Sequence, residues 1–309
     1  MNPLLSGLIW LVLLVPSLAV MILPRPWELW LGKRLGRLAL KLDPVRRKIA
    51  EDNIRRCLPE LGPAGWKKLL RENYEHYGIL TFELMHMFSP VPGHYRRYVE
   101  QNAVVDNYEV FERLNARKKG TIAVTGHFAN WEMMGVAGLR GINCMVTGKR
   151  LKPDWLNARV VAARLSIFVR TASGRRIMPE LLRWIKEGNT STFILDQYAG
   201  PPAGVPVEFF GVKVDTQGAV GLVASRTGAP IFMVYQRRDA KGVIHDVFEE
   251  AVLSEAELKD PVLATQALAS RVEAWLRANP AQWLWVHRRF KNVAWPSELQ
   301  SVGPRAQNR

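Results

Sequence analysis

The stretch from Thr121 to Glu132 limits the possible folds of this chain more than any other. The residues from Thr121 to Thr125 are small or β-branched, and Gly126 and a polar cluster follow them. Such a run predicts a short buried strand that ends at Gly126, with a helix beginning near Asn130 as its N-cap. We therefore expect an α/β fold in which a strand of the central sheet leads straight into a helix.

His127 lies at this predicted turn, and Glu132 lies in the first turn of the predicted helix. Residues five positions apart do not share a helical face, but a histidine just before a helix can fold back onto a carboxylate inside it. A neutral imidazole takes a proton from a hydroxyl, while a paired carboxylate fixes its tautomer and stabilises the imidazolium that forms. The sequence contains no Gly-x-Ser-x-Gly nucleophile elbow, so the histidine is expected to activate a hydroxyl of the substrate.

The same spacing has a second interpretation, which the residues alone leave open. His127 is then a buried histidine with hydrogen-bonded ring nitrogens, and Glu132 only complements the positive end of a helix. The surroundings of the imidazole distinguish the two interpretations.

Composition limits the class of protein. A chain of 309 residues with 48% hydrophobic residues can bury a large core, and a single α/β domain commonly reaches this length. The formal net charge of +15 favours an anionic partner, such as nucleic acid, anionic lipid or an acidic carrier protein, without choosing among them. Only two cysteines are present, Cys57 and Cys144, and no His-Glu-x-x-His motif occurs, so neither a disulfide scaffold nor a zinc site is expected.

The N-terminus carries an uncharged apolar run from Leu4 to Leu23, broken only by Pro16. Its length matches a hydrocarbon core of about 30 Å. Basic residues follow it, so the side after the run should be cytoplasmic. A cleaved signal peptide is the competing interpretation, but no lysine or arginine precedes the run and no clear Ala-x-Ala site follows it. We expect residues 1–24 to form a transmembrane or membrane-anchoring helix and residues 25–309 to form the functional domain.

The rest of the chain alternates between helical and strand patterns. Apolar residues recur at helical spacing over 43–58, 64–87, 107–117, 155–166, 177–186, 216–227 and 263–276. Further strands are expected at 141–147, 190–195, 230–236 and 244–251. These elements predict a central sheet flanked by helices.

The segment from Asp196 to Gly211 is rich in glycine and proline, so it is expected to be an ordered loop. It nevertheless contains apolar residues, among them Phe209 and Phe210. Two interpretations remain open for these side chains: they line a groove for an acyl chain near the reactive histidine, or they tuck the loop over the core.

Five elements in this order resemble the bacterial lipid A biosynthesis acyltransferases, the late acyltransferases of the lysophospholipid acyltransferase superfamily. The resemblance covers nearly the whole chain. The C-terminal element is the most distinctive. The elements are the N-terminal anchor, His127 with Glu132, Asp196-Gln197 with Gly204–Gly211, Thr227–Pro230 and Trp285–Lys291.

The resemblance implies a glycerolipid-acyltransferase-like fold with a mixed sheet, on the cytoplasmic face of the bacterial inner membrane. It also implies transfer of a fatty acyl group from acyl carrier protein to a hydroxyl of a glycolipid such as a lipid A precursor, without a cofactor or metal. His127 would be the general base and Glu132 its orienting partner. The substrate-binding residues are expected to be Arg150, which would meet a phosphate, Asp196, Gln197, Phe209, Phe210, and, for the acidic carrier, Arg288 and Arg289.

Two departures from the family pattern leave the acceptor open. Glu208 stands where the family usually has proline, and Lys149 stands where a tyrosine is common. An acyltransferase for another membrane lipid, a lysophospholipid or an aminolipid, therefore remains an alternative.

A membrane-tethered basic module that binds nucleic acid or anionic lipid without chemistry is the alternative from a different class. It explains the charge and the anchor. It does not explain a His/Glu pair at a strand end, and the sequence contains no recognised nucleic-acid motif. We therefore expect an enzyme with no nucleic-acid partner.

Overall fold

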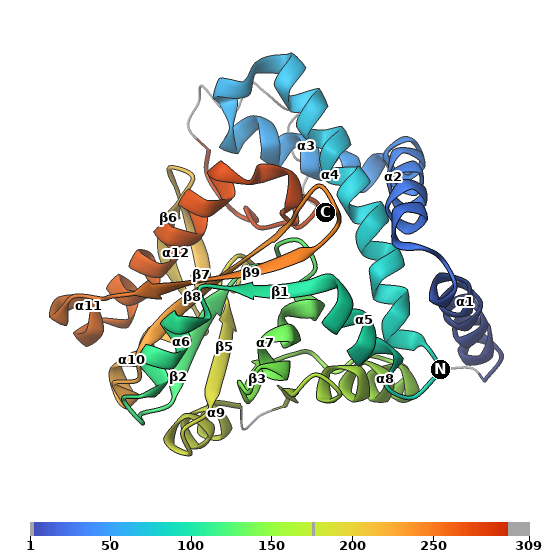
Figure 1. Ribbon diagram of the computed structural model, residues 1–309. Coiled ribbons are helices and arrows are strands. Elements are labelled where there is room, and N and C mark those ends of the chain that lie inside the picture. Colours follow the sequence, from blue (N-terminus) through green and yellow to red (C-terminus); the bar gives the residue numbers. More distant parts are fainter. Residues whose placement is uncertain (1–2, 175–176, 296–309) are drawn as a thin grey trace.

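The computed structural model describes residues 3–174 and 177–295 and is built around a seven-stranded sheet (Figure 1). The strand order is β1-β9-β8-β2-β5-β3-β4, and a separate hairpin pairs β6 with β7. The strands are β1 (Ala103–Asp106), β2 (Thr121–Thr125), β3 (Cys144–Thr147), β4 (Val169–Ala172), β5 (Thr190–Ile194), β6 (Gly204–Phe209), β7 (Val212–Gln217), β8 (Ile231–Arg238) and β9 (Ile244–Ala251). The α/β class with a mixed sheet is confirmed.

Helices surround this sheet. The α-helices are α1 (Pro3–Met21), α2 (Arg25–Leu42), α3 (Pro44–Cys57), α4 (Gly62–Met85), α5 (His94–Asn102), α6 (Tyr108–Asn115), α7 (Val136–Leu139), α8 (Asp154–Leu165), α9 (Ile177–Lys186), α10 (Ala219–Thr227), α11 (Glu255–Lys259) and α12 (Pro261–Ala278). The short 3₁₀ helices are η1 (Pro59–Leu61), η2 (His86–Phe88), η3 (Trp131–Gly135) and η4 (Pro280–Gln282).

Strands β8, β2, β5, β3 and β4 run parallel to one another, whereas β9 is antiparallel to β8. The five parallel strands therefore end at the same edge of the sheet. Strand β2 is buried along its whole length, and β5 is nearly so, because helices cover both faces of the sheet. In such sheets ligands bind beyond the carboxyl ends of the strands, so this edge is where a functional site is expected.

The C-terminal segment after α12 completes this edge. Trp283 forms an isolated bridge to Phe128, directly after β2. Asn73 and Tyr77 of α4 donate hydrogen bonds to the Trp283 carbonyl at 2.8 and 2.9 Å. Because the indole rings of Trp283 and Trp285 are almost fully buried, this segment is part of the core rather than a surface tail.

The structure differs from the sequence prediction in two loops near this edge. The expected loop from Asp196 to Gly211 contains strand β6, and the expected helix over 216–227 begins only at Ala219 because β7 precedes it. After β2 a 3₁₀ turn, η3, stands where a regular helix was predicted. Glycine and proline are compatible with hairpin strands as well as with loops, so composition alone did not separate the two.

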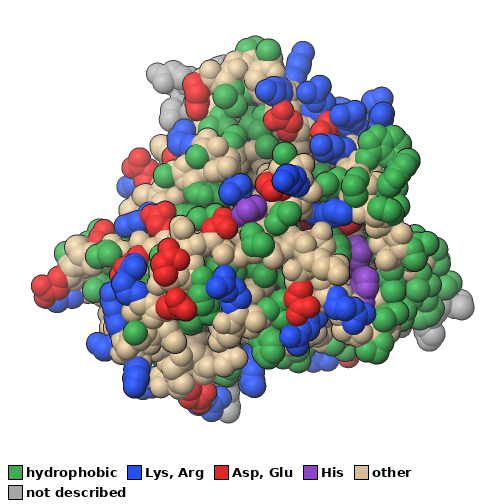
Figure 2. Space-filling model, in the orientation of Figure 1, with side chains coloured by type: hydrophobic (Ala, Val, Ile, Leu, Met, Phe, Trp, Pro, Cys, Tyr) green, Lys and Arg blue, Asp and Glu red, His purple; other side chains and the backbone are tan. Residues whose placement is uncertain are grey.

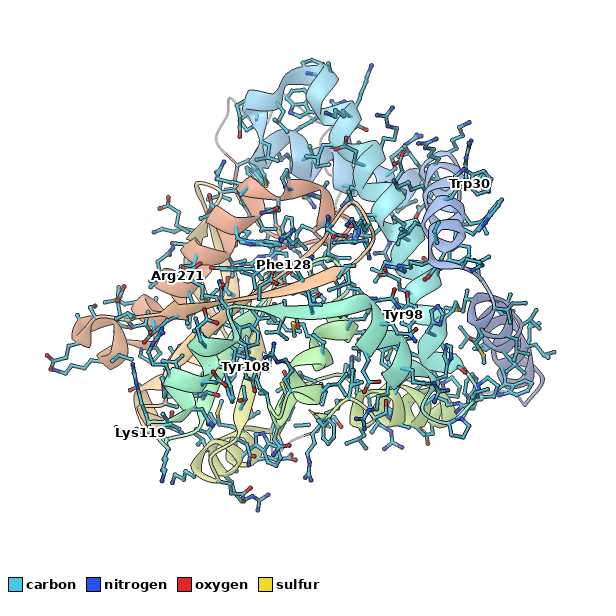
Figure 3. The ribbon with its side chains drawn as sticks, in the orientation of Figure 1. Trp30, Tyr98, Tyr108, Lys119, Phe128 and Arg271 are labelled. Atoms are coloured by element: carbon cyan, nitrogen blue, oxygen red, sulfur yellow. The ribbon has the colours of Figure 1, made fainter. Side chains whose placement is uncertain are left out.

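Hydrophobic side chains gather over α1 and α2 (Figure 2). Trp10, Leu18, Trp27 and Trp30 are all exposed, and Trp30 points away from the body of the molecule (Figure 3). Within residues 3–174 and 177–295, no helix is both long enough and apolar enough to cross a membrane. The spanning form of the 1–24 prediction is not confirmed, and its role as a membrane anchor stays a prediction.

Helices α2 and α4 lie side by side because glycine faces glycine where they cross (Figure 1). A Cβ atom added to Gly78 of α4 would lie 1.9 Å from the carbonyl oxygen of Gly32 and 2.5 Å from the backbone nitrogen of Gly36. Both atoms belong to the backbone of α2 and cannot move aside like a flexible side chain. The close packing of these helices therefore requires glycine at position 78.

We predict that Gly78→Ala lowers the free energy of unfolding by about 1–3 kcal/mol, the usual effect of overpacking, despite the better helix propensity of alanine. Gly7→Ala in α1 is the matched control, because a Cβ there meets no atom within 4 Å. Chemical denaturation of the detergent-extracted protein measures both. Equal stability of the two variants would show that the helices separate easily.

Candidate active site

His127 and Asp196 meet because β2 and β5 are parallel neighbours in register. Thr125 pairs with Ile194 at the ends of these strands, and the Leu195 amide donates to the Thr125 carbonyl at 3.0 Å. Two residues further along, the sheet places His127 beside Asp196. The sequence placed both residues directly after strands but did not predict which strands are adjacent.

The Asp196 carboxylate holds His127 by two hydrogen bonds. The backbone amide of His127 donates to Oδ2 at 2.6 Å, and its Nδ1 is 2.8 Å from Oδ1. The Trp283 indole donates to Oδ2 at 2.7 Å. An ionised carboxylate only accepts, so Nδ1 carries the imidazole proton and Nε2 is left as the basic atom.

Burial and pairing act in opposite directions on these two groups. Burial lowers the pKa of His127, but the charge and hydrogen bond of Asp196 more than compensate and raise that pKa above its ordinary value of 6.5. Burial raises the pKa of Asp196, but His127 and Trp283 bring it below its ordinary value of 3.8. Asp196 therefore stays ionised and increases the basicity of the imidazole.

A cavity of about 460 Å³ opens in front of His127 at the carboxyl edge of the sheet. Its lining is partly apolar and partly basic. The apolar lining includes Met134, Val146, Val160, Val161, Val169 and Phe193. The polar lining includes Glu132, Lys149, Arg150, Arg164, Gln197 and Tyr198. This combination suits a ligand with a hydrocarbon part and an anionic part.

Glu132 does not orient His127 in the structure, so the expected His127–Glu132 pair is corrected to His127–Asp196. Instead Glu132 forms a bidentate pair with Arg164 of α8, with N–O distances of 2.7 and 2.6 Å. A charged guanidinium is a stronger partner for a carboxylate than a neutral imidazole. The charge of Glu132 still contributes to the raised pKa of His127.

Gln197 is the second expected substrate residue that the structure places at the imidazole. Its amide nitrogen lies 3.1 Å from His127 Nε2 and donates to it. Trp131 packs its ring edge against the same imidazole, with 4.9 Å between ring centroids. The amide of Gln197 thus faces the nitrogen that would accept a substrate proton.

Arg150 lines the cavity, as expected of a substrate-binding residue, and is exposed. Its guanidinium lies 3.2 Å from the exposed carboxylate of Asp154, the first residue of α8. Exposed pairs of this kind are weak, so an anion can compete for the guanidinium.

Phe209 and Phe210 do not line the cavity, so the expectation of an acyl-chain groove there is wrong. Both rings are buried and pack against Trp283 and Phe290. Phe209 ends β6 and Phe210 lies in the turn before β7, and both rings face the core rather than the cavity. The other interpretation of the segment, that it is tucked over the core, is confirmed.

Arg289 is also not a surface residue, which corrects its expected role in carrier binding. It is fully buried and donates to the Gln197 and Asp215 carbonyls at 2.9 and 2.8 Å. It therefore fixes the backbone of the loop that carries Gln197. Arg288, its neighbour, is exposed and remains available to a partner.

The sequence did not single out Arg164, Trp131 or Tyr198. A signal for the orienting role of Asp196 was present, because Asp196 and His127 each follow a predicted strand. No comparable signal pointed to Arg164, which lies within an ordinary helix.

Known proteins resemble this chain along most of its length. The Escherichia coli (strain K12) lipid A biosynthesis lauroyltransferase is 27% identical over 296 residues, 92% of this chain and 89% of that protein. The palmitoleoyltransferase of lipid A biosynthesis from the same organism is 26% identical, over 87% of this chain and 86% of that protein. A phosphatidylinositol mannoside acyltransferase of Mycolicibacterium smegmatis is 29% identical over 60% of this chain and 62% of that protein.

The pattern that defines one family extends over residues 3–292 of this chain. That family is described as bacterial lipid A biosynthesis acyltransferase. The resemblance expected from the sequence motifs is therefore confirmed. This chain belongs to the bacterial lipid A biosynthesis acyltransferase family, whose members are acyltransferases.

Proposed function

We propose that this protein transfers a fatty acyl group from the thioester of acyl carrier protein to a hydroxyl of a glycolipid such as a lipid A precursor. The observation that carries the proposal is the His127–Asp196 pair, which leaves the basic Nε2 of the imidazole in a cavity with apolar and cationic walls. His127 acts as general base, and Asp196 is its orienting partner.

In the proposed reaction, Nε2 takes the proton of the acceptor hydroxyl while the hydroxyl oxygen attacks the thioester carbonyl carbon. A carbon–oxygen bond forms, the carbon–sulfur bond breaks, and the imidazolium returns the proton to the departing thiolate. No acylated side chain is required. Cys144 also lines the cavity, but burial raises its thiol pKa to about 11, so it is a poor nucleophile.

Gln197 is proposed to contact the reacting groups. Its amide already lies at hydrogen-bonding distance from Nε2, on the side from which a hydroxyl would approach. When the acceptor hydroxyl takes the place of the Gln197 amide at Nε2, that amide can donate to the oxyanion that develops on the thioester carbonyl.

The cationic wall of the cavity is proposed to bind an anionic group of the acceptor. Lys149 and Arg150 follow β3 at the mouth of the cavity. The related proteins are named for lipid A and for phosphatidylinositol mannoside, and both lipids are phosphorylated glycolipids. A glycolipid phosphate therefore accounts for both basic residues, while other membrane lipids remain the alternative acceptors.

Arg288 and Lys291 are proposed to attract the acidic carrier protein. Both are exposed, and the Lys291 ammonium lies 5.8 Å from the ring centre of Tyr198, which lines the cavity. A carrier bound at these residues would deliver its thioester close to His127.

The exposed apolar side chains of α1 and α2 are proposed to hold the protein on the cytoplasmic face of the inner membrane. Trp27 and Trp30 pack edge to face, and the Arg34 guanidinium lies over the Trp30 ring at 5.0 Å. Aromatic rings beside basic side chains suit the interface between lipid and water. A lipid acceptor would then reach the cavity without leaving the bilayer surface completely.

We predict that His127→Ala lowers kcat/KM by at least about 10² to 10⁴, because general-base assistance is lost. Asp196→Asn should be about as harmful, although it keeps the shape of the side chain. Two donors meet Oδ2, so the new amide oxygen must take that place. The amide nitrogen then faces Nδ1 and imposes the wrong imidazole tautomer, a defect that costs about 10⁴ in a serine protease.

The measurement for these variants is transfer of labelled acyl groups from acyl carrier protein to total membrane lipid, with the product identified by mass spectrometry. The kcat/KM of the double variant, His127→Ala with Asp196→Asn, should be barely lower than that of His127→Ala alone, because both residues serve one proton transfer. Independent, additive losses or a trapped acyl-enzyme would contradict the mechanism. A wild-type protein that transfers no label at all would indicate a binding module.

A second prediction concerns pH. The base must be neutral, so kcat/KM should fall as pH drops through the pKa of His127, with a midpoint above the ordinary value of 6.5. Glu132→Gln removes a charge that raises this pKa and leaves Arg164 unpaired at the cavity. Both changes disfavour the imidazolium, so the midpoint should move to lower pH. An unchanged midpoint would show that Glu132 does not act on the imidazole.

A third prediction concerns the carrier. Reversing the charges of Arg288 and Lys291 to glutamate should raise the apparent KM for acyl carrier protein more at low salt than at high salt, because salt screens exposed charges. Reversing the charges of Arg183 and Lys186 is the matched control. Both are exposed and lie in the last turn of α9, close to the start of β5 and therefore at the opposite edge of the sheet. An effect independent of ionic strength would assign Arg288 and Lys291 to another role.

A further inference from the structure

The backbone turn that carries His127 is strained. Ala129 has a φ of +39°, in a region that residues with a side chain rarely adopt. Such a conformation persists only where the surroundings hold it in place. The contacts of Ala129 and Asn130 therefore bear directly on the position of His127.

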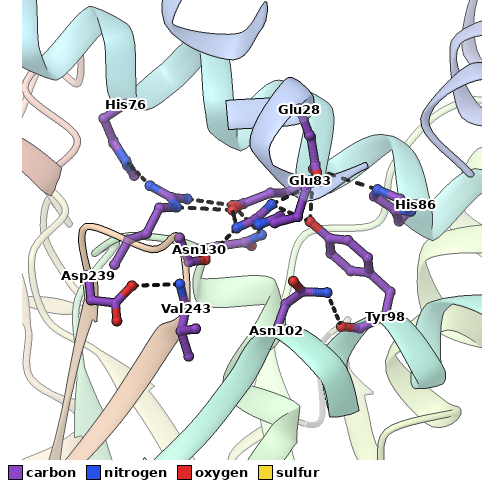
Figure 4. A network of polar contacts seen from close by, with 12 residues as sticks. Glu28, His76, Glu83, His86, Tyr98, Asn102, Asn130, Asp239 and Val243 are labelled. Carbon is purple, nitrogen blue, oxygen red and sulfur yellow. Dashed lines mark hydrogen bonds and ion pairs between the residues drawn. The ribbon is translucent and has the colours of Figure 1, made fainter. Parts of the chain in front are cut away.

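Asn130 anchors this turn to a carboxylate inside the protein. Its side chain is buried, and its amide nitrogen donates to Glu83 Oε2 at 3.0 Å (Figure 4). Glu83 also receives hydrogen bonds from two arginines. Arg25 donates to its Oε1 at 2.6 Å, and Arg238 donates to both of its oxygens.

The charges around Glu83 make it a fixed acceptor. Burial raises the pKa of Glu83, but Arg238 and Arg25 lower it below its ordinary value of 4.5. His76 accepts a hydrogen bond from Arg238 at 2.6 Å, and burial and the charge of Arg238 lower the pKa of His76 to about 3. The histidine is thus neutral, and Glu83 remains an ionised acceptor for the Asn130 amide.

The same cluster holds the other side of the turn. The Ala129 amide donates to the Gln282 carbonyl at 3.0 Å. The Gln282 side chain in turn binds the backbone of Arg238, accepting from its amide at 2.6 Å and donating to its carbonyl at 2.9 Å. Arg238 thus connects Glu83 with the contacts of both Ala129 and Asn130.

We propose that Glu83 and Asn130 are positioning residues for His127. Their hydrogen bond ties the strained turn to helix α4 and keeps the imidazole against Asp196 with Nε2 directed at the cavity. This inference rests on the proposed role of His127 as general base. It predicts that loss of the Asn130 anchor impairs the chemical step more than it impairs substrate binding.

Asn130→Ala is the central variant. It removes the anchor and leaves the two arginine contacts of Glu83 in place. Gln236→Ala is the matched control, because Gln236 is likewise a buried amide that donates to a buried carboxyl, that of Asp246, at 2.6 Å. Its loss should affect stability in a similar way without reaching the turn.

We expect Asn130→Ala to lower kcat by about 10- to 100-fold with KM changed by less than about threefold, because displacing a catalytic group by an ångström has effects of this size. Gln236→Ala should keep kcat within about twofold of the wild type. A second readout needs no substrate. The pKa of the His127 ring, measured by NMR, should fall towards its ordinary value in Asn130→Ala as the contact with Asp196 loosens.

A substitution of nearly the same shape adds a second test. Asn130→Asp places a carboxylate against Glu83, whose two oxygens only accept hydrogen bonds, so it should lower kcat at least as far as Asn130→Ala. A wild-type kcat in Asn130→Asp, together with a His127 pKa in Asn130→Ala that is unchanged from the wild type, would overturn the positioning role.

The test separates this inference from the proposed function. His127→Ala is assayed in the same series. If it retains full activity, the proposed general base is wrong. If His127→Ala is inactive while the kcat of Asn130→Ala equals that of the wild type, or falls no further than that of Gln236→Ala, only the positioning role is wrong.

Discussion

The hydrogen bonds that converge on the Asp196 carboxylate connect three separate segments of the chain at the candidate general base. They come from the backbone and side chain of His127, after β2, and from the indole of Trp283, in the C-terminal segment. One buried carboxylate thus ties two adjacent strand ends to the chain that closes the core. A buried charge is stable only when it is paired in this way, so folding of these segments and assembly of the site depend on each other.

The strand ends that carry the chemistry were predictable from the sequence. Short apolar runs that stop at His127 and at Asp196 indicated the carboxyl ends of sheet strands, which is where α/β proteins bind ligands. The pattern of apolar residues and the positions of the glycines were sufficient to predict these strand ends, because a strand pattern depends only on residues that are close in the sequence. The family motifs then indicated the class of enzyme.

Pairings across the fold were not predictable in the same way. Glu132 was assigned to His127 because five positions separate them, whereas its partner Arg164 comes from a distant helix. The predicted substrate-binding roles of Phe209 and Arg289 were wrong for a similar reason. An apolar residue in a loop, or one of two consecutive arginines, looks the same in the sequence whether its side chain faces a ligand or the core. Burial decides their roles, and burial is a property of the tertiary structure.

The three acidic residues around the turn differ in what their partners can do. Glu83 and Glu132 are paired with arginines, and a guanidinium keeps its proton at any pH at which the protein is folded. These pairs therefore keep their charge throughout a reaction and do not exchange protons with the substrate. Asp196 is paired with an imidazole, which can gain and release a proton near neutral pH. The proposed proton transfer thus belongs to His127 and Asp196, while the two arginine-bound carboxylates maintain the turn and the cavity wall on either side of it.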